Sequence, residues 1–109
     1  MTHYLVKFND YWADEMDISS ITIVNEKVVE LIEKQYLKYQ SEEATQYIEF
    51  YFGTNEYNTY NFIELYNCLD ITPITPEETQ VLVKFTTDMS AIAESAIEYL
   101  LNNDVWEVE

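Results

Sequence analysis

The balance of charge constrains this chain more than any other feature of its sequence. Its 109 residues include 21 aspartates and glutamates but only five lysines and no arginine, which gives a formal net charge of −16 at pH 7. Repulsion between like charges on this scale destabilises a compact state. A stable fold must therefore keep its carboxylates on the surface and bury enough apolar area to offset their repulsion.

The composition supplies the apolar residues for such a core. Hydrophobic residues make up 48% of the sequence and aromatic residues 16%, whereas a disordered acidic tail is poor in both. With one glycine and two prolines, most of the chain is free to form regular structure. We expect a single domain that spans residues 1–109.

Charge and cysteine content also indicate the cellular compartment and limit the classes of partner. Cys68 is the single cysteine, so no intrachain disulfide forms, which fits a reducing compartment. The sequence shows no secretory signal and no apolar run of the roughly 20 residues that span a bilayer. We expect a cytoplasmic protein. The negative charge disfavours contact with anionic membranes and direct binding of nucleic acid, because both present phosphates.

Two strands and a helix are predicted first along the chain. Residues 3–9 alternate between apolar and polar, and residues 18–24 are rich in β-branched side chains. The acidic segment 10–17 between them is predicted to be a loop, longer than a tight hairpin. Asn25 is a favoured N-cap, so a helix is expected to run from there to about Tyr39.

The middle of the chain predicts a second hairpin. Residues 41–45 form a polar break, residues 46–52 a strand and residues 53–55, with the only glycine, a turn. Residues 57–70 are predicted to return as the partner strand. A helix remains the alternative, because the apolar residues of 62–69 also fit helical spacing.

Two prolines introduce the next segment. Pro73 and Pro76 are predicted to mark a turn, and Thr75 with Glu78 has the spacing of a capping box. A helix is expected from there to about Phe85, with a strand as the alternative for residues 76–86.

The end of the chain is predicted to form a helix and a strand. Asp88 can cap a helix over residues 89–102, and residues 105–108 are expected to form a short final strand. The predicted order is ββαββααβ. Grouped strands and helices indicate an α+β fold with a mostly antiparallel sheet of four to five strands and about three helices.

The acids are not balanced locally by bases. Eight acidic residues lie between Lys38 and Lys84 and six follow Lys84, with no base in either segment. Carboxylates two residues apart on a strand share a face and lie about 6.6 Å apart, at a rise of about 3.3 Å per residue. This spacing is similar to that of neighbouring phosphates on a nucleic-acid strand. The alternative is a solvated surface that keeps the protein soluble.

Tyrosines cluster in the same region. Five of the ten lie in the predicted middle hairpin, close to three glutamates: Tyr47, Tyr51, Tyr57, Tyr60 and Tyr66 beside Glu49, Glu56 and Glu64. Tyrosine is enriched at interface hot spots, and its ring attracts cations. The pattern favours a surface for lysine and arginine, with packing against the sheet as the alternative.

Candidate chemistry is sparse. His3 and Cys68 are the only residues for a Cys–His nucleophile pair, and a zinc site needs more such ligands. The acidic segment 10–17 lacks the spacing and the glycine of an EF-hand loop. We expect no enzyme activity, no cofactor and no metal; a small metal-binding module is the alternative.

The opening stretch Tyr4–Asp17, together with size, charge and tyrosine-rich α+β character, resembles small acidic inhibitors encoded by phages and mobile elements. These include anti-CRISPR and anti-restriction proteins that imitate DNA. The resemblance is one of type, and no contact residue is carried over. It implies a protein that acts in the cytoplasm of the host cell. Its target would be a nucleic-acid-binding enzyme or effector of a host defence system, blocked at its basic channel.

The sequence thus predicts an acidic inhibitor that binds a basic protein. The alternative is a different kind of binder, an immunity protein or antitoxin that neutralises a basic toxin. The sequence is also compatible with a homodimer. The predicted partner-binding residues are Asp14, Glu15, Asp17, Glu49, Tyr51, Glu56, Tyr57, Tyr60, Glu64 and Asp70.

Overall fold

The computed structural model describes residues 2–13, 16–40, 46–51, 57–83 and 91–106. Within these residues, five strands and five helices follow one another in the order ββαββαβααα, which confirms an α+β fold. The elements are β1 (His3–Ala13), β2 (Met16–Asn25), α1 (Glu26–Tyr39), β3 (Ile48–Tyr51), β4 (Tyr57–Tyr60), α2 (Phe62–Asn67), β5 (Leu69–Ile74), α3 (Pro76–Val83), α4 (Ala91–Leu101) and α5 (Asn103–Trp106).

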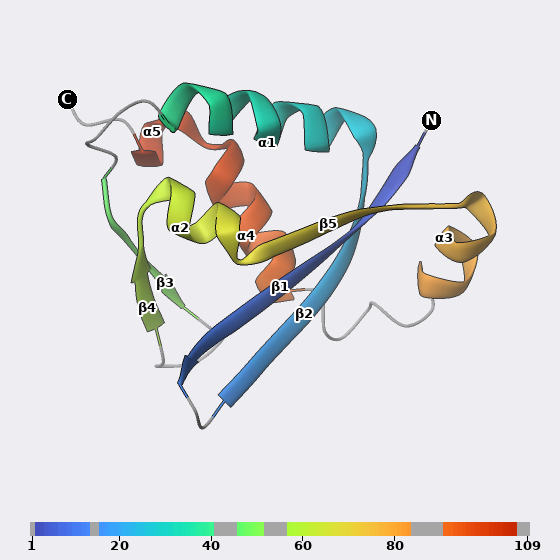
Figure 1. The fold of residues 1–109 in the computed structure, drawn as a ribbon, viewed down its shortest axis with the longest axis horizontal. Coiled ribbons are helices and arrows are strands. Elements are labelled where there is room, and N and C mark those ends of the chain that lie inside the picture. The colour runs from blue at the N-terminus through green and yellow to red at the C-terminus, as the bar shows by residue number, and fades with distance from the viewer. Residues whose placement is uncertain (1, 14–15, 41–45, 52–56, 84–90, 107–109) are drawn as a thin grey trace.

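The described strands form two antiparallel sheets rather than one. The larger sheet has the order β2-β1-β5, and β3 pairs with β4 in a separate two-stranded sheet. Helices α1 and α4 lie on one side of the larger sheet, and the β3–β4 hairpin and α3 lie at opposite ends of the molecule (Figure 1).

The first hairpin is longer and tighter than predicted. The segment 10–17 was expected to be a loop, but β1 continues to Ala13 and β2 begins at Met16, and these two residues pair. A register shift between Asp10 and Ala13 interrupts the ladder. The prediction was wrong because an acidic composition does not prevent pairing once a neighbouring strand continues the ladder.

One face of the larger sheet builds the core. Val6 and Phe8 of β1 are fully buried, while Lys7 between them is exposed, as strand alternation requires. Ser20 of β2 is also buried, and its Oγ accepts a hydrogen bond of 3.1 Å from the Ala93 N–H. That N–H belongs to the first turn of α4, where helix donors lack partners within the helix. A strand side chain therefore helps to fix where α4 begins against the sheet.

Helix α1 confirms the prediction from its cap. Asn25 accepts a hydrogen bond from the Val28 N–H at 3.2 Å, and the helix ends at Tyr39. Val29, Ile32 and Tyr39 are its buried residues.

The segment 57–70 combines both predicted alternatives. β4 covers its first four residues, and residues 62–67 form the helix α2 rather than a continued strand. Asn61 and Glu64 make the two reciprocal hydrogen bonds of a capping box, at 2.8 and 3.2 Å. Asn followed three residues later by Glu is the sequence signal that favours this helix.

The strand β5 was not predicted as a separate element. It pairs with β1, and Pro73 lies opposite Tyr4 within that ladder rather than in a turn. Proline is tolerated there because β5 is at the edge of its sheet, where one side of the strand needs no partner.

The capping box at Thr75 is confirmed. The Thr75 N–H donates to Glu78 Oε1 at 3.0 Å, and the Glu78 N–H donates to Thr75 Oγ1 at 3.1 Å. Helix α3 follows and runs to Val83. The predicted cap at Asp88 lies outside the described residues.

The predicted final strand over 105–108 is wrong. Residues 103–106 form a single helical turn, α5, which follows α4 almost directly. Trp106 is 1% exposed, and its indole Nε1–H donates to the Tyr99 carbonyl at 2.6 Å. A buried tryptophan with a satisfied N–H anchors the turn to the core, and this outweighs the strand propensity of the segment.

Side chains from both sheets and four helices meet in one core. Phe50 is the meeting point of the rings of Phe8, Tyr60 and Tyr99, whose centroids lie 5.5, 6.1 and 5.8 Å from it. The core consists of Val6, Phe8, Ile32, Tyr39, Phe50, Tyr60, Phe62, Leu65, Ala93, Ala96, Ile97, Leu100 and Trp106.

Candidate partner-binding surface

The β3–β4 hairpin has one face in the core and one face toward solvent. Phe50 and Tyr60 on the inner face are 0% and 5% exposed. Outward-facing residues pair across the strands, Tyr51 with Tyr57 and Glu49 with Thr59, and all four are exposed. The packed inner face thus holds these four side chains on a fixed scaffold.

Tyrosine dominates this outward face. The side chains of Tyr47, Tyr51 and Tyr57 are 59%, 49% and 48% exposed. The rings of Tyr51 and Tyr57 contact one another, with centroids 5.2 Å apart and planes tilted by 41°. Half-exposed aromatic rings in one place are typical of protein interfaces rather than of an ordinary surface.

Glu49 is the carboxylate of this face. Tyr51 donates its hydroxyl hydrogen to Glu49 Oε2 at 3.1 Å. This hydrogen bond to Glu49 and the charge of the same carboxylate raise the pKa of Tyr51. The neutral phenol of Tyr51 thus donates to the carboxylate and holds it near the tyrosine side chain.

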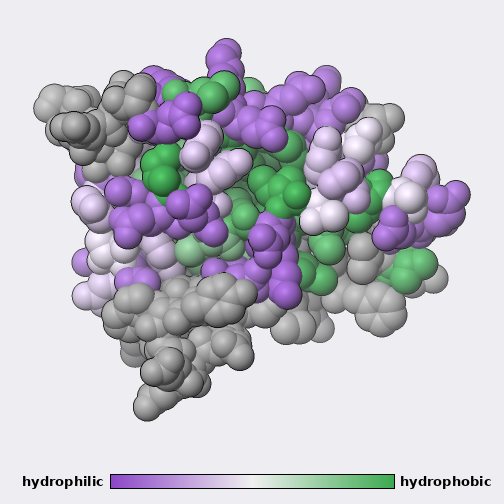
Figure 2. Space-filling view, in the orientation of Figure 1, coloured by the Kyte–Doolittle hydropathy of each residue, from purple (hydrophilic) through white to green (hydrophobic). Residues whose placement is uncertain are grey.

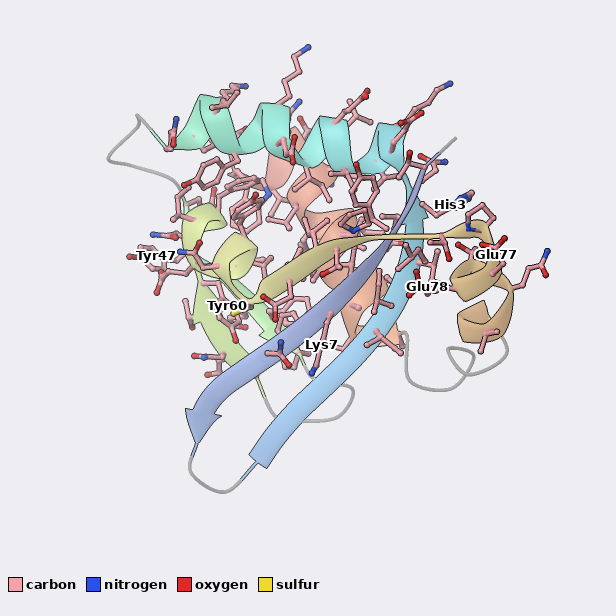
Figure 3. All side chains as sticks on the ribbon, turned by 45° about the vertical axis from the view of Figure 1, so that its right-hand side comes forward. His3, Lys7, Tyr47, Tyr60, Glu77 and Glu78 are labelled. Carbon is pink, nitrogen blue, oxygen red and sulfur yellow. The ribbon has the colours of Figure 1, made fainter. Side chains whose placement is uncertain are left out.

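The outward face continues to the start of α2. The Asn61 Nδ2 donates to the Tyr47 hydroxyl at 3.5 Å, next to the capping box that Asn61 forms with Glu64. In Figure 3, Tyr47 lies at the margin of the molecule close to α2, on the same side as Tyr60. We name the surface of Tyr47, Glu49, Tyr51, Tyr57 and Thr59 the hairpin face.

The structure brings together three of the ten predicted residues, Glu49, Tyr51 and Tyr57. Tyr47 was not among them, although it stands two residues before Glu49 and the alternation of a strand predicts that both point the same way. Tyr60 is a correction: it is buried and packs against Phe50, so it supports the hairpin face without being part of it.

The other predicted residues lie apart or outside. Glu64 is exposed but accepts the capping hydrogen bond from Asn61, and Asp70 lies on the larger sheet opposite Lys7. Asp17 lies near the start of β2. Asp14, Glu15 and Glu56 are outside the described residues.

A row of carboxylates at phosphate-like spacing is not found on the described strands of the hairpin. The outward positions of β3 and β4 hold one carboxylate, Glu49, beside two tyrosines and a threonine. Exposed carboxylates instead occur on every described helix, for example Glu30, Glu77 and Glu98. Among the described residues the acidic charge is therefore spread over all the helices, and the tyrosines distinguish the hairpin face.

Helix α1 carries a surface of the opposite kind. At 3.6 residues per turn, Lys27, Leu31, Lys34 and Lys38 follow one flank of the helix, and Glu26, Glu30 and Glu33 follow another. A groove of about 320 Å³ beside the lysine flank is lined by Leu31, Lys34, Gln35, Lys38, Leu101 and Asn103. Three of the five bases thus share one flank, which is locally basic.

The fold separates His3 and Cys68, the two residues considered for a nucleophile pair. His3 pairs with Ile74 at one end of the β1–β5 ladder, and Phe8 pairs with Leu69, the residue after Cys68, at the other. Five residues of strand at about 3.3 Å each separate the backbones at these two ends by about 17 Å, too far for His3 and Cys68 to form a nucleophile pair.

The only histidine lies instead at a shallow pocket. Thr2, His3, Glu26, Ile74 and Pro76 line this volume of about 390 Å³. Glu77 and Glu78 lie nearby at the start of α3, where Figure 3 shows them beside His3. Within the described ranges, no group of three or more His, Cys, Asp or Glu side chains is arranged to hold a metal ion.

No protein-family model, curated protein or solved structure matches this chain. Among the helices of the described residues, none has the length and apolar character needed to cross a membrane.

Proposed function

We propose that this chain is an inhibitor that docks its hairpin face on the basic surface of a nucleic-acid-binding protein, in the manner expected of small acidic anti-defence proteins. The observation that carries the proposal is the exposed tyrosine cluster of the hairpin face, with Glu49 hydrogen-bonded to the hydroxyl of Tyr51. This cluster is displayed on a hairpin whose other face is part of the core.

Tyrosines give the contact its affinity. A tyrosine offers a large contact area with few rotatable bonds and a polar tip, and such residues form the hot spots of many interfaces. The interior of an interface is also depleted in charged residues. One carboxylate among three tyrosines fits that composition better than a dense acidic patch does.

Charge gives the encounter its speed and its choice of partner. A net charge of −16 attracts a basic surface from a distance and repels acidic proteins and nucleic acids. The lysine flank of α1 is the part of the described surface that a basic partner approaches least readily. The molecule is therefore expected to meet a basic groove with its hairpin face and with α1 turned away.

The proposal is tested by capture and competition. The immobilised chain is exposed to bacterial lysate at low and at high salt, and retained proteins are identified. We expect a nucleic-acid-binding protein that is released by salt and, independently, by its own DNA or RNA. The Tyr51→Ala/Tyr57→Ala double variant should lose it.

The matched control is Leu37→Ala, which removes an exposed apolar side chain of 63% exposure from α1. Retention of the partner by this variant locates the contact on the hairpin face. The proposal is overturned if the retained protein is indifferent to nucleic acid, as a toxin with its own active site would be. It is also overturned if both variants retain the partner equally.

A further inference from the structure

The hairpin face holds a fixed carboxylate next to two aromatic rings, an arrangement that suits one kind of cation. We infer that it is an arginine-selective subsite, in which a guanidinium group lies on the ring of Tyr57 or Tyr51 and pairs with Glu49. The inference rests on the proposed function, since it names the residue type through which a basic partner is recognised.

The carboxylate is positioned before any partner arrives. Tyr51 binds one oxygen, Oε2, at 3.1 Å, and Glu49 is exposed. A carboxylate accepts about four hydrogen bonds, so acceptor capacity remains for the N–H groups of a guanidinium. Because the Tyr51 hydroxyl already restricts the Glu49 side chain, binding costs less conformational entropy than at a free surface glutamate.

The rings are placed for a planar cation. Tyr57 and Tyr51 are about half exposed, so each offers ring surface to solvent. In the register of the hairpin, Glu49 lies opposite Thr59 and diagonal to Tyr57. Diagonal neighbours on one face are roughly 7–8 Å apart at their backbones, within reach of long side chains.

Arginine fits this arrangement better than lysine. The guanidinium is flat, less strongly hydrated and able to stack on a ring while it donates two parallel hydrogen bonds to a carboxylate. The ammonium of lysine is a compact, strongly hydrated charge without a flat face to stack or a rigid pair of parallel donors. The chain has no arginine of its own, so none of its own side chains can occupy the subsite in this way.

Two short peptides test the inference. They are identical except that one carries a single arginine flanked by glycine and serine, and the other carries lysine at that position. Each is titrated into the isotopically labelled chain, and amide shifts in NMR spectra report binding. We expect the arginine peptide to bind about threefold to tenfold more tightly, with the largest shifts at residues 47–51 and 57–61.

Substitutions then locate the selectivity. Glu49→Gln removes the charge, and Tyr57→Leu keeps an apolar side chain but removes the aromatic ring. Each should bring the two peptides to within about twofold of one another. Glu94→Gln, which removes an exposed carboxylate from α4, is the control and should leave the preference unchanged. Unchanged spectra outside the hairpin show that the variants fold.

The outcomes separate the subsite from the proposed function. Equal binding of the two peptides, or equal losses in Glu49→Gln and Glu94→Gln, shows diffuse attraction and overturns the subsite, while competition with nucleic acid still stands. Arginine selectivity without any captured nucleic-acid-binding protein supports the subsite and counts against the proposed function.

Discussion

The two sheets turn very different faces to solvent. On the larger sheet, Lys7 lies directly opposite Asp70, and Asn9 Nδ2 donates to Asp70 Oδ2 at 3.0 Å. On the hairpin face, Glu49 lies opposite Thr59 and is bound only by a tyrosine hydroxyl among the contacts described. The first face places opposite charges across neighbouring strands and binds its carboxylate with an amide, whereas the second leaves a carboxylate and its aromatic neighbours available for a cation.

The contrast extends to the support beneath each face. The larger sheet consists of three strands and is covered by α1 and α4, while the hairpin has two strands of four residues each. A two-stranded hairpin is only marginally stable alone, so the hairpin face depends on the residues that fix it to the core. Figure 2 shows how hydropathy is distributed over one face of the molecule, where hydrophobic residues lie toward the middle and hydrophilic residues lie around them.

The strongest test of the comparison separates the two faces of the hairpin itself. Phe50→Ala removes a fully buried ring and should lower the free energy of unfolding by about 3–5 kcal/mol. Tyr51→Ala, one residue away, removes an exposed ring and should cost no more than about 1 kcal/mol. Urea denaturation followed by fluorescence measures both. Similar losses would mean that the Tyr51 ring is a structural element and not a surface for a partner.

A second test concerns the link between the hairpin and α2. Asn61→Ala removes the N-cap of α2 and the contact to the Tyr47 hydroxyl. Loss of a cap costs about 1 kcal/mol, and the same change should loosen Tyr47. Asn67→Ala, on an exposed residue at the other end of α2, is the control. If amide exchange of residues 47–51 is unchanged in Asn61→Ala, the α2 cap does not support the hairpin face.

The fold was predictable where the signals are local. Asn25 and the Thr75–Glu78 capping box mark helix starts, because a cap needs only the chain within three residues of itself. β5 and α5 depend on distant partners. β5 pairs with β1 across more than 60 residues of sequence, and the position of Trp106 in α5 is fixed by its packing in the core. Such packing overrides the local preference that the sequence displays.

The candidate site follows the same division. Glu49, Tyr51 and Tyr57 were predicted because tyrosines and glutamates cluster in the predicted middle hairpin. The alternation of side chains along a strand would have added Tyr47. Applied to β4, the same period places Tyr60 inward once Tyr57 is outward, which explains why its inclusion was wrong. That Asp70 belongs to another sheet follows only from the pairing of β5 with β1.

A third test exchanges the roles of the two carboxylates. Asp70→Asn weakens the attraction to Lys7 and should reduce stability by up to about 0.5–1 kcal/mol, with little effect on the arginine peptide. Glu49→Gln should do the reverse, leaving stability nearly unchanged and reducing binding. Thermal unfolding measures the stability of each variant, and peptide titration measures its affinity for the arginine peptide. If Asp70→Asn weakens peptide binding as much as Glu49→Gln does, the difference between the two faces disappears.

The smallest expected effect is a change in the titration of one tyrosine. The hydrogen bond to Glu49 raises the pKa of Tyr51, so the folded state favours the neutral phenol more than the unfolded state does. Its contribution to stability is complete below the unfolded pKa of about 10 and is lost as the pH rises through the higher folded pKa. Glu49→Gln should lower the pKa of Tyr51 toward the ordinary tyrosine value, as followed by the ring carbon shift in NMR spectra.

Tyr66 provides the internal reference for that titration. Burial, more than the nearby Glu33, raises its pKa, and its ring stacks on Tyr36 with centroids 4.4 Å apart. Its pKa should therefore be the same in the wild type and in Glu49→Gln. A Tyr51 pKa that does not fall in the variant would mean that the hydroxyl does not hold Glu49 in solution. The carboxylate would then be no better positioned on the hairpin face than any other surface glutamate, and the hairpin face would not be expected to prefer arginine over lysine.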